Sequence, residues 1–184
     1  MMKKGGLRAF TTLLAFAPVQ AVLADHHAAP AEPLHASVLN GESEQIGTAV
    51  FEQTPVGVLI SVAIEGLPLG EHGFHIHEVG VCDPGEGFKM AGGHFTPRSH
   101  QHGLKVAAGP HAGDMPNQFA GADGIMRAVV LNSNVTLEAG PGSLADADGS
   151  ALVIHAGADD YMSQPTGAAG GRLACAVIRP PEPL

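Results

Sequence analysis

Five of the histidines between residues 74 and 114, together with one aspartate, are spaced in a way that suits a pair of metal ions. A further histidine follows much later, at the end of an apolar run. The set is His75, His77, His94, His102, His111, Asp114 and His155. Imidazole is a borderline ligand suited to copper and zinc, and a single carboxylate among imidazoles suits zinc. The sequence therefore predicts a metal centre.

The pair His75 and His77 lies in a segment with the character of a strand. Side chains at positions i and i+2 leave a strand on the same face, so both imidazoles can approach one ion while Ile76 points the other way. An isolated pair of this kind is more often incidental than metal-binding. A metal site is favoured by the further histidines downstream. The first of them, His94, follows Gly92-Gly93, whose backbone freedom lets the side chain reach inward.

His102, His111 and Asp114 stand in a loop rich in glycine and proline. Such a loop has little packing of its own, and a zinc ion held by three histidines and one aspartate would order it. His155 ends the apolar run 151–154, where a neutral histidine of the core is the alternative to a metal ligand.

Short β-prone runs alternate with turn residues from Leu34 onward, and no stretch has a sustained helical period. Tight turns are expected at Asn40-Gly41, Glu65-Gly66 and Asp148-Gly149. We predict an all-β sandwich or barrel whose chemistry lies on two long loops, 79–124 and 156–172. The predicted strands are 34–39, 46–53, 57–64, 73–78, 125–131, 151–155 and 173–178.

The first 24 residues have the features of a secretory signal. A positive segment containing Lys3, Lys4 and Arg8 precedes an apolar one, and cleavage after Ala24 is favoured over Ala21. A membrane anchor is the alternative, but the apolar stretch is too short and contains a proline. We predict a signal over 1–24, a flexible tether over 25–33 and one domain over 34–184.

The charge of the chain limits its partners. Without residues 1–24 it has 6 basic and 18 acidic residues, a formal net charge of −12. That charge disfavours nucleic acid and anionic membrane surfaces. No membrane partner is expected once the signal is removed.

Cys82 and Cys175 are the two cysteines, 93 positions apart. In an exported protein a disulfide between them is the default expectation. The competing interpretation, two soft metal ligands, is weaker because neither has a C-x-x-C partner.

Five motifs in this chain resemble those of the copper/zinc superoxide dismutases, and the resemblance runs in the right order through nearly all of 34–178. The insertion between Cys82 and His94, with the signal, resembles the bacterial exported branch. The fold implied is an eight-stranded Greek-key β-barrel. The motifs are Gly73-Phe74-His75-Ile76-His77-Glu78, Gly92-Gly93-His94-Phe95-Thr96-Pro97, His111-Ala112-Gly113-Asp114, Leu152-Val153-Ile154-His155 and Gly171-Arg172-Leu173-Ala174-Cys175.

The resemblance implies two cofactors, copper and zinc, and assigns ligands to each. His94 is implied to bridge both ions as an imidazolate. His102 is chosen over His100 because its nine-residue step to His111 and the following Gly103 match the family pattern. The implied copper ligands are His75, His77, His94 and His155, and the implied zinc ligands are His94, His102, His111 and Asp114.

The resemblance also implies roles for residues near the metal ligands. Arg172 is placed beside the open copper position, where a fixed cation attracts and orients a small anion. Asp159 resembles the aspartate that hydrogen-bonds one copper and one zinc histidine, and His72 is expected to be structural. Two departures are Thr96, where the family usually has asparagine, and the loop 161–165, which lacks the charged guiding residues of the animal enzymes. Lys89 is therefore a candidate for steering the substrate.

The activity implied is disproportionation of superoxide to oxygen and hydrogen peroxide in the periplasm, by a copper ion that takes an electron from one superoxide and gives it to the next. A non-catalytic metal-binding protein is the alternative, and it would require damage to the copper ligands or to Arg172. The sequence does not distinguish a monomer from a homodimer, nor does it identify a copper donor.

Cleavage after Ala24 would expose a second set of nitrogen donors. The new amine, two backbone amides and the imidazole of the third residue can surround one ion in a plane, which favours Cu(II) or Ni(II). The residues are Asp25, His26 and His27. The alternative is a mobile polar tether with two solvated histidines.

Overall fold

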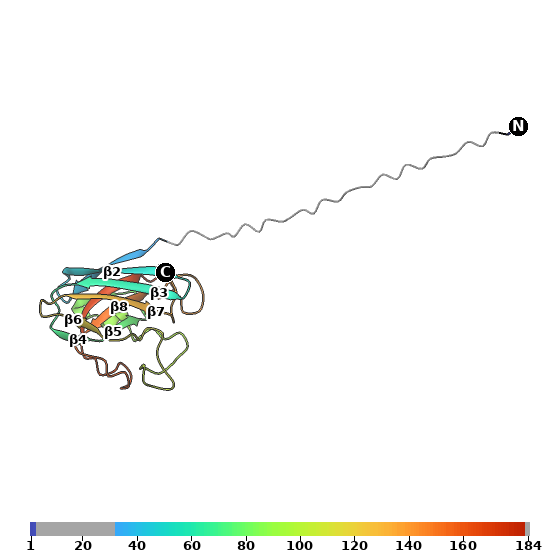
Figure 1. Cartoon of the computed structure of the whole chain (residues 1–184). Helices are drawn as coiled ribbons and strands as arrows, with labels where there is room; N and C mark the ends of the chain where they lie inside the picture. Colours follow the sequence, from blue (N-terminus) through green and yellow to red (C-terminus); the bar gives the residue numbers. More distant parts are fainter. Residues whose placement is uncertain (3–31, 183–184) are drawn as a thin grey trace.

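The computed structural model describes residues 1–2 and 32–182, which are almost entirely strand and loop (Figure 1). One antiparallel sheet contains the nine strands of that part of the chain, in the spatial order β4-β6-β7-β3-β2-β1-β9-β8-β5. The predicted all-β class is confirmed. The strands are β1 (Leu34–Asn40), β2 (Gln45–Thr54), β3 (Gly57–Ile64), β4 (Gly70–His72), β5 (Phe74–His77), β6 (Gln118–Ala120), β7 (Met126–Asn132), β8 (Ser150–His155) and β9 (Arg172–Arg179).

The sheet curls into a nearly closed barrel because its two edge strands, β4 and β5, are consecutive in the chain. Only Gly73 separates them. Its N–H donates to the Gly157 carbonyl, and its own carbonyl accepts from the His155 N–H. At this residue the chain leaves β6, the partner of β4, and joins β8, the partner of β5. A side chain here would press on the Ala169 methyl and on the His75 ring.

All seven predicted strands are present, each with ends within one residue of the prediction. The eight strands that the resemblance implied become nine because Gly73 splits one of them. The sequence analysis did not predict β6 or a separate β4, since three residues are too few for apolar alternation to be visible.

The core lies inside the barrel and is built by alternation along the strands. On β3, Val58, Ile60, Val62 and Ile64 are buried, whereas the residues between them are partly or fully exposed. The strands β5 and β8 differ, because every one of their residues is buried. Their second face is covered by loops, so the strands that carry His75, His77 and His155 are enclosed on both sides.

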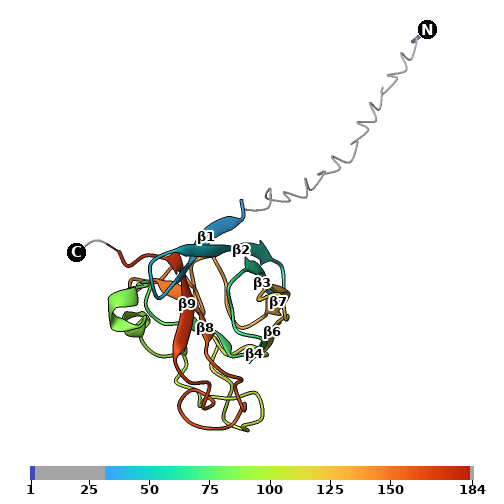
Figure 2. The same cartoon turned by 90° about the vertical axis from the view of Figure 1, so that its left-hand side faces the viewer.

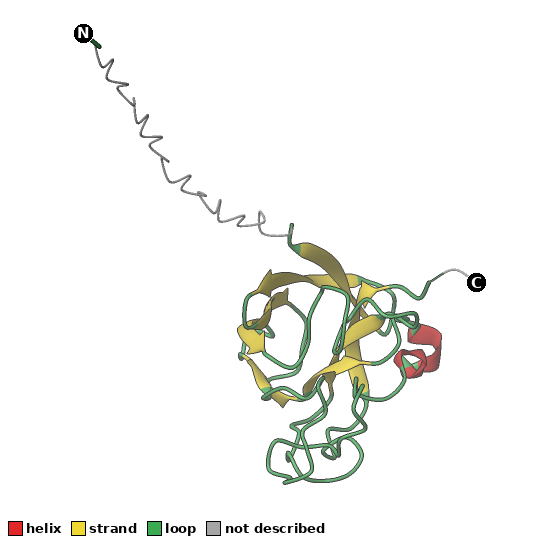
Figure 3. Ribbon diagram, turned by 90° about the vertical axis from the view of Figure 1, so that its right-hand side faces the viewer, coloured by secondary structure: helices red, strands yellow, loops and turns green. Residues whose placement is uncertain are grey.

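Two long connections leave one end of the barrel, at the bottom of the view in Figure 2. The first runs from β5 to β6 and contains two 3-10 helices, η1 (Pro84–Glu86) and η2 (Lys89–Ala91), drawn red in Figure 3. The second runs from β8 to β9. The two loops that the sequence analysis associated with chemistry therefore lie together.

The predicted disulfide is confirmed, since Cys82 and Cys175 are joined with their Cα atoms 5.6 Å apart. Cys175 is fully buried in the middle of β9. Around the bond, Phe88, Ala91, Ala151 and Val153 form a small second core. The disulfide thus anchors the first long loop to the barrel.

Residues 1–2 and 32–182 contain no helix that is long and apolar enough to cross a membrane. Residues 3–24 of the predicted signal, most of the predicted tether and the segment 25–27 lie outside the described residues.

We expect the double substitution Cys82→Ser and Cys175→Ser to lower the free energy of unfolding by about 4–5 kcal/mol, because the disulfide closes a loop of 93 residues in the unfolded chain. Denaturant titration of the metal-free variant and the metal-free parent, followed by circular dichroism, measures the difference without a contribution from metal. A loss below about 1 kcal/mol would contradict the entropic account.

Candidate metal centre

Four histidines from three parts of the chain form the first cluster. His75 and His77 lie on β5, His155 ends the neighbouring β8, and His94 is held beside β5 by a backbone bridge to His77. One ring nitrogen from each lies within 4.8 Å of the others. All four side chains are buried. The structure thus brings together the whole set expected for copper.

The second cluster shares His94 and adds three residues of the first long loop. Asp114 is its centre: its Oδ1 lies 2.8 Å from Nδ1 of His94 and 3.1 Å from Nδ1 of His102. Nδ1 of His111 is 3.3 Å from the same oxygen, but the two atoms are not aligned for a hydrogen bond. The other oxygen, Oδ2, accepts from the backbone N–H groups of Gly103 and His111. The structure thus brings together the set expected for zinc.

Three ring nitrogens in these clusters are buried without a hydrogen-bond partner: Nδ1 of His75, Nε2 of His94 and Nδ1 of His111. A buried polar atom without a partner is costly, and it marks a place where a ligand or ion is expected. Three histidines with one carboxylate fit zinc, and four imidazoles fit copper. The residues present therefore fit both ions.

Burial favours the neutral form of His77, His94 and His155 in the first cluster, which is the form that binds metal. It lowers the pKa of His94 to about 4 and that of His155 to about 3, and it holds the pKa of His77 well below its usual range. Repulsion from neighbouring imidazoles contributes to the lowered pKa of all three. For His102, burial is outweighed by hydrogen bonds to Asp114 and Asp159, which raise its pKa.

Asp159 joins the two clusters through the outer nitrogens of their histidines. Its Oδ2 accepts from Nε2 of His75 at 2.9 Å, and its Oδ1 accepts from Nε2 of His102 at 3.0 Å. Burial raises the pKa of Asp159, but hydrogen bonds from His75, Tyr161 and His102 outweigh it and lower the pKa to about 2. The carboxylate is thus charged and fixes the orientation of two rings.

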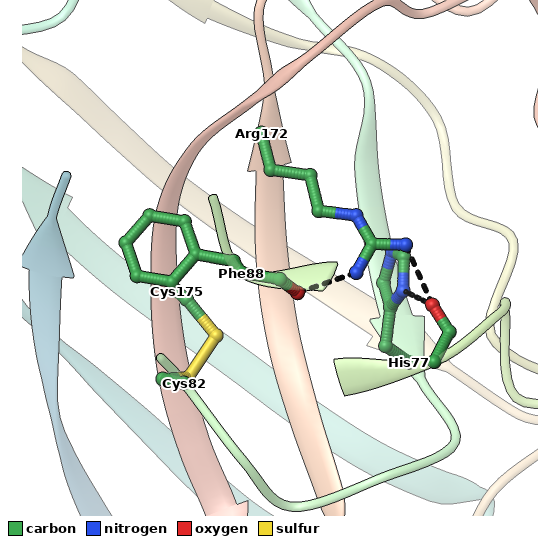
Figure 4. The surroundings of a disulfide bond; sticks show 6 residues. His77, Cys82, Phe88, Arg172 and Cys175 are labelled. Atoms are coloured by element: carbon green, nitrogen blue, oxygen red, sulfur yellow. Dashed lines mark hydrogen bonds between the residues drawn. A yellow bond between two sulfur atoms is a disulfide. The ribbon is translucent and has the colours of Figure 1, made fainter. Parts of the chain in front are cut away.

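Arg172 opens β9 and lies beside the first cluster. Its Nη1 donates to the Phe88 carbonyl at 2.5 Å, and its Nη2 donates to the Gly92 carbonyl at 2.6 Å, as Figure 4 shows. The Gly92 carbonyl also accepts from Nδ1 of His77. Burial lowers the pKa of Arg172, yet a guanidinium stays charged. Both acceptors flank η2, so the loop that the disulfide anchors also holds this cation.

The other residues that the sequence analysis discussed lie outside the two clusters. Lys89 is exposed at the start of η2, directly after Phe88. His72 is buried outside both clusters, with its ring nitrogens 2.8 Å from the carbonyls of His155 and Pro68. His100 is exposed, and Oγ1 of Thr96 accepts from its backbone N–H. The structure brings His102 into the cluster and leaves His100 outside it.

Three supporting residues were missed by the sequence analysis. Asn117 exchanges two hydrogen bonds with the backbone of Asp159. Gln164 does the same with the backbone of His102, its Oε1 accepting and its Nε2 donating. Gly167 leaves room for the Asp159 carboxylate, since a Cβ there would collide with it. No pattern in the sequence marks them, because each acts on a segment far away in the chain.

Comparisons with known proteins agree with this geometry. A family model described as copper/zinc superoxide dismutase matches residues 45–178. The copper/zinc superoxide dismutases 1 and 2 of Aquifex aeolicus are 50% and 52% identical over 147 residues, covering 79% of this chain and 86% and 85% of theirs.

Solved structures are similar as well. A copper/zinc superoxide dismutase from Brucella abortus is 30% identical with a TM-score of 0.65, covering 80% of this chain and 100% of that one. A SOD-like protein from Bacillus subtilis is 36% identical with a TM-score of 0.75, covering 79% of this chain and 97% of that one. Since the matched family model spans both clusters and the strands that hold them, this chain belongs to the copper/zinc superoxide dismutase family.

Proposed function

We propose that the two clusters divide the work of a superoxide dismutase, with copper in the first and zinc in the second. The observation that carries this assignment is the placement of His94, whose Nε2 is buried without a partner while its Nδ1 lies against Asp114. One ring can therefore serve both ions. The copper ligands are His75, His77, His94 and His155, and the zinc ligands are His94, His102, His111 and Asp114.

In the reaction, two superoxide anions and two protons give one oxygen and one hydrogen peroxide. One anion loses an electron, and the next gains an electron and two protons. Copper, when bound, supplies the one-electron exchange, and zinc has no redox chemistry. Nε2 of His94 has no protein partner, so whenever it is not a metal ligand it is the atom at which this chain can hold one of the protons.

Arg172 has the role of attracting and orienting the anion. A charge held by two carbonyls costs no reorganisation when the substrate arrives. It acts at short range, because the guanidinium lies beside His77 at the edge of the first cluster (Figure 4).

A non-catalytic metal-binding protein is the second candidate. One relative, 36% identical, is named a superoxide dismutase-like protein, so likeness to the family does not by itself establish activity. In this chain seven ligand side chains and the held guanidinium lie together, and this favours the enzyme.

The site of action and the copper supply are further parts of the proposal. The relatives named above come from bacteria, and the signal-like sequence of residues 1–24 favours export to the periplasm. Copper would then come from a donor protein or through the nitrogen donors of Asp25, His26 and His27, if cleavage leaves Asp25 first.

We expect Arg172→Ala to lower kcat/KM for superoxide about 10-fold or more while copper and zinc contents stay full, because the variant loses the fixed cation and no metal ligand. Pulse radiolysis of the metal-loaded variant measures the rate. Arg179→Ala, at the far end of β9, is the control with the same change in charge. An unchanged rate for Arg172→Ala would refute the role given to this residue.

Asp159→Ala should keep the barrel and weaken zinc binding about 10–100-fold, since the variant loses the bond that orients the His102 ring. Competition with a chelator measures the affinity. Asp160→Ala is the control, because Asp160 lies in the same loop and its carboxylate bonds to Met162 and Ser163 and to neither cluster. Equal zinc affinity in Asp159→Ala and the parent would contradict the orienting role.

Lys89→Glu should slow the reaction at low salt and approach the parent as ionic strength rises. Superoxide dismutases are an established case of electrostatic steering, and salt screens such long-range attraction. Arg179→Glu changes the net charge equally, roughly 23 Å away from Arg172 along β9, and should have little effect. A loss that does not depend on salt would point to damage to the loop and against steering.

A further inference from the structure

A cavity of about 540 Å³, lined by no residue of the two metal clusters, lies where three segments of the chain meet. The first segment is the turn 53–57 between β2 and β3, and the second is part of 133–142, which follows β7. The third is the first long loop, through parts of 96–100 and 109–112. Since β3 pairs with both β2 and β7 (Figure 1), the turn and the segment after β7 lie at the same end of these strands. The volume of this cavity is typical of small-molecule sites.

Two amide side chains hold the walls of the cavity together. Oε1 of Gln53 accepts from Oγ1 of Thr136 at 3.0 Å and from the backbone N–H of Leu137 at 2.7 Å, which joins the turn to the segment after β7. Nδ2 of Asn132 donates to the Ala112 carbonyl at 2.9 Å, which joins β7 to the first long loop. Asn132 is itself buried. The cavity is thus formed by segments that are fixed to one another.

Rigid apolar side chains make up much of the lining. Val56 is 63% exposed at the tip of the turn, and four prolines lie around it in the lining. A proline side chain has almost no conformational freedom to lose when a ligand packs on it, so contact with these walls has a low ordering cost. A flat apolar ring buries much of its area against such walls. The prolines are Pro55, Pro97, Pro110 and Pro141.

The charges of the cavity favour an anion. None of the described residues that line it is acidic, although the chain has 18 acidic residues. Arg98 is exposed, and no carboxylate of residues 32–182 pairs with its guanidinium. Nδ1 of His100 donates to the Pro110 carbonyl at 3.0 Å, which leaves Nε2 for a ligand. Ser133 and Asn134 add an exposed hydroxyl and an exposed amide.

We propose that this cavity binds a small anion with a flat apolar ring, in the chemical class of the aryl phosphate monoesters. The phosphate group pairs with Arg98, whose planar guanidinium matches two phosphate oxygens at once. The ring packs against the prolines and Val56. Substrate turnover needs neither contact, so this site is separate from the reaction at the metal clusters.

The cavity is linked to the second cluster through the first long loop. Pro110 and Ala112 line the cavity and flank His111, a zinc ligand in the proposed function on which this link rests. A ligand that fixes these two residues favours the arrangement of the loop that holds zinc. Because such coupling is reciprocal, zinc must strengthen the binding of the ligand by the same factor.

Titration of the ¹⁵N-labelled, metal-loaded protein with phenyl phosphate tests the proposal, with copper kept reduced so that the NMR lines stay sharp. The amide signals of Val56, Arg98 and Ser133 should shift together, with a Kd of about 0.1–1 mM for a ligand of this size. Phenol lacks the anion and inorganic phosphate lacks the ring, so each should bind about 5-fold more weakly or worse. Phenyl phosphate that shifts none of these signals would overturn the proposal.

Variants locate the binding site. Arg98→Ala removes the cation and Val56→Asp places a carboxylate in the lining, so each should weaken phenyl phosphate binding about 5-fold or more. Arg127→Ala on β7, with the same change in charge, and Arg172→Ala, which removes the cation beside the first cluster, should bind like the parent. Binding that is lost in Arg172→Ala and kept in Arg98→Ala would refute the cavity as the site.

Removal of zinc tests the link to the loop. The zinc-free protein should bind phenyl phosphate about 2- to 5-fold more weakly than the metal-loaded protein, within the usual range of coupling between two sites. An equal Kd in both forms would refute the link, whereas binding in the cavity is decided by the variants. Arg98→Ala should dismutate superoxide at the parent's rate, so failure of this proposal and failure of the proposed function give different results.

Discussion

Six histidine rings meet between the β5–β8 wall of the barrel and the loops that cover it. The burial of their nitrogens is the constraint to which the surrounding structure responds. Without metal, each buried nitrogen that lacks a partner costs about 1–3 kcal/mol, and protonation is suppressed because burial lowers the pKa of His77, His94 and His155. An arrangement that is unfavourable as a protein core is therefore favourable as a metal site.

The two clusters differ in how the chain supports them. His75, His77 and His155 stand on β5 and β8, whose backbones are paired within the barrel. His102 and His111 stand on a loop whose order depends on Asp114, Asp159 and a few side-chain bonds to the backbone. Asp159 connects the two kinds of support, because one carboxylate bonds a ring from each.

Much of this arrangement follows from local patterns. Alternation along β3 and the i, i+2 spacing of His75 and His77 are properties of single strands, so the sequence predicts them. The ligand sets were assigned through resemblance to a family, because the distance from His94 to His155 depends on the whole fold. The pairs Asn117–Asp159 and Gln164–His102 join segments about 40 and 60 residues apart. Loop-to-loop bonds of this kind leave no periodic trace in a sequence.

Gly73 has a consequence for how the protein behaves in crowded solution. A sheet normally ends in two strands whose unpaired N–H and C=O groups invite another chain to add itself, which is a route to aggregation. Here the two ends are the short strands β4 and β5, of three and four residues, joined by one glycine. Gly73 and the end of β8 bond to each other, and the β5 edge is covered by the loop through the bonds that Ile76 exchanges with Gly113 and Phe95. The barrel thus offers a fibril almost no free edge from which to grow.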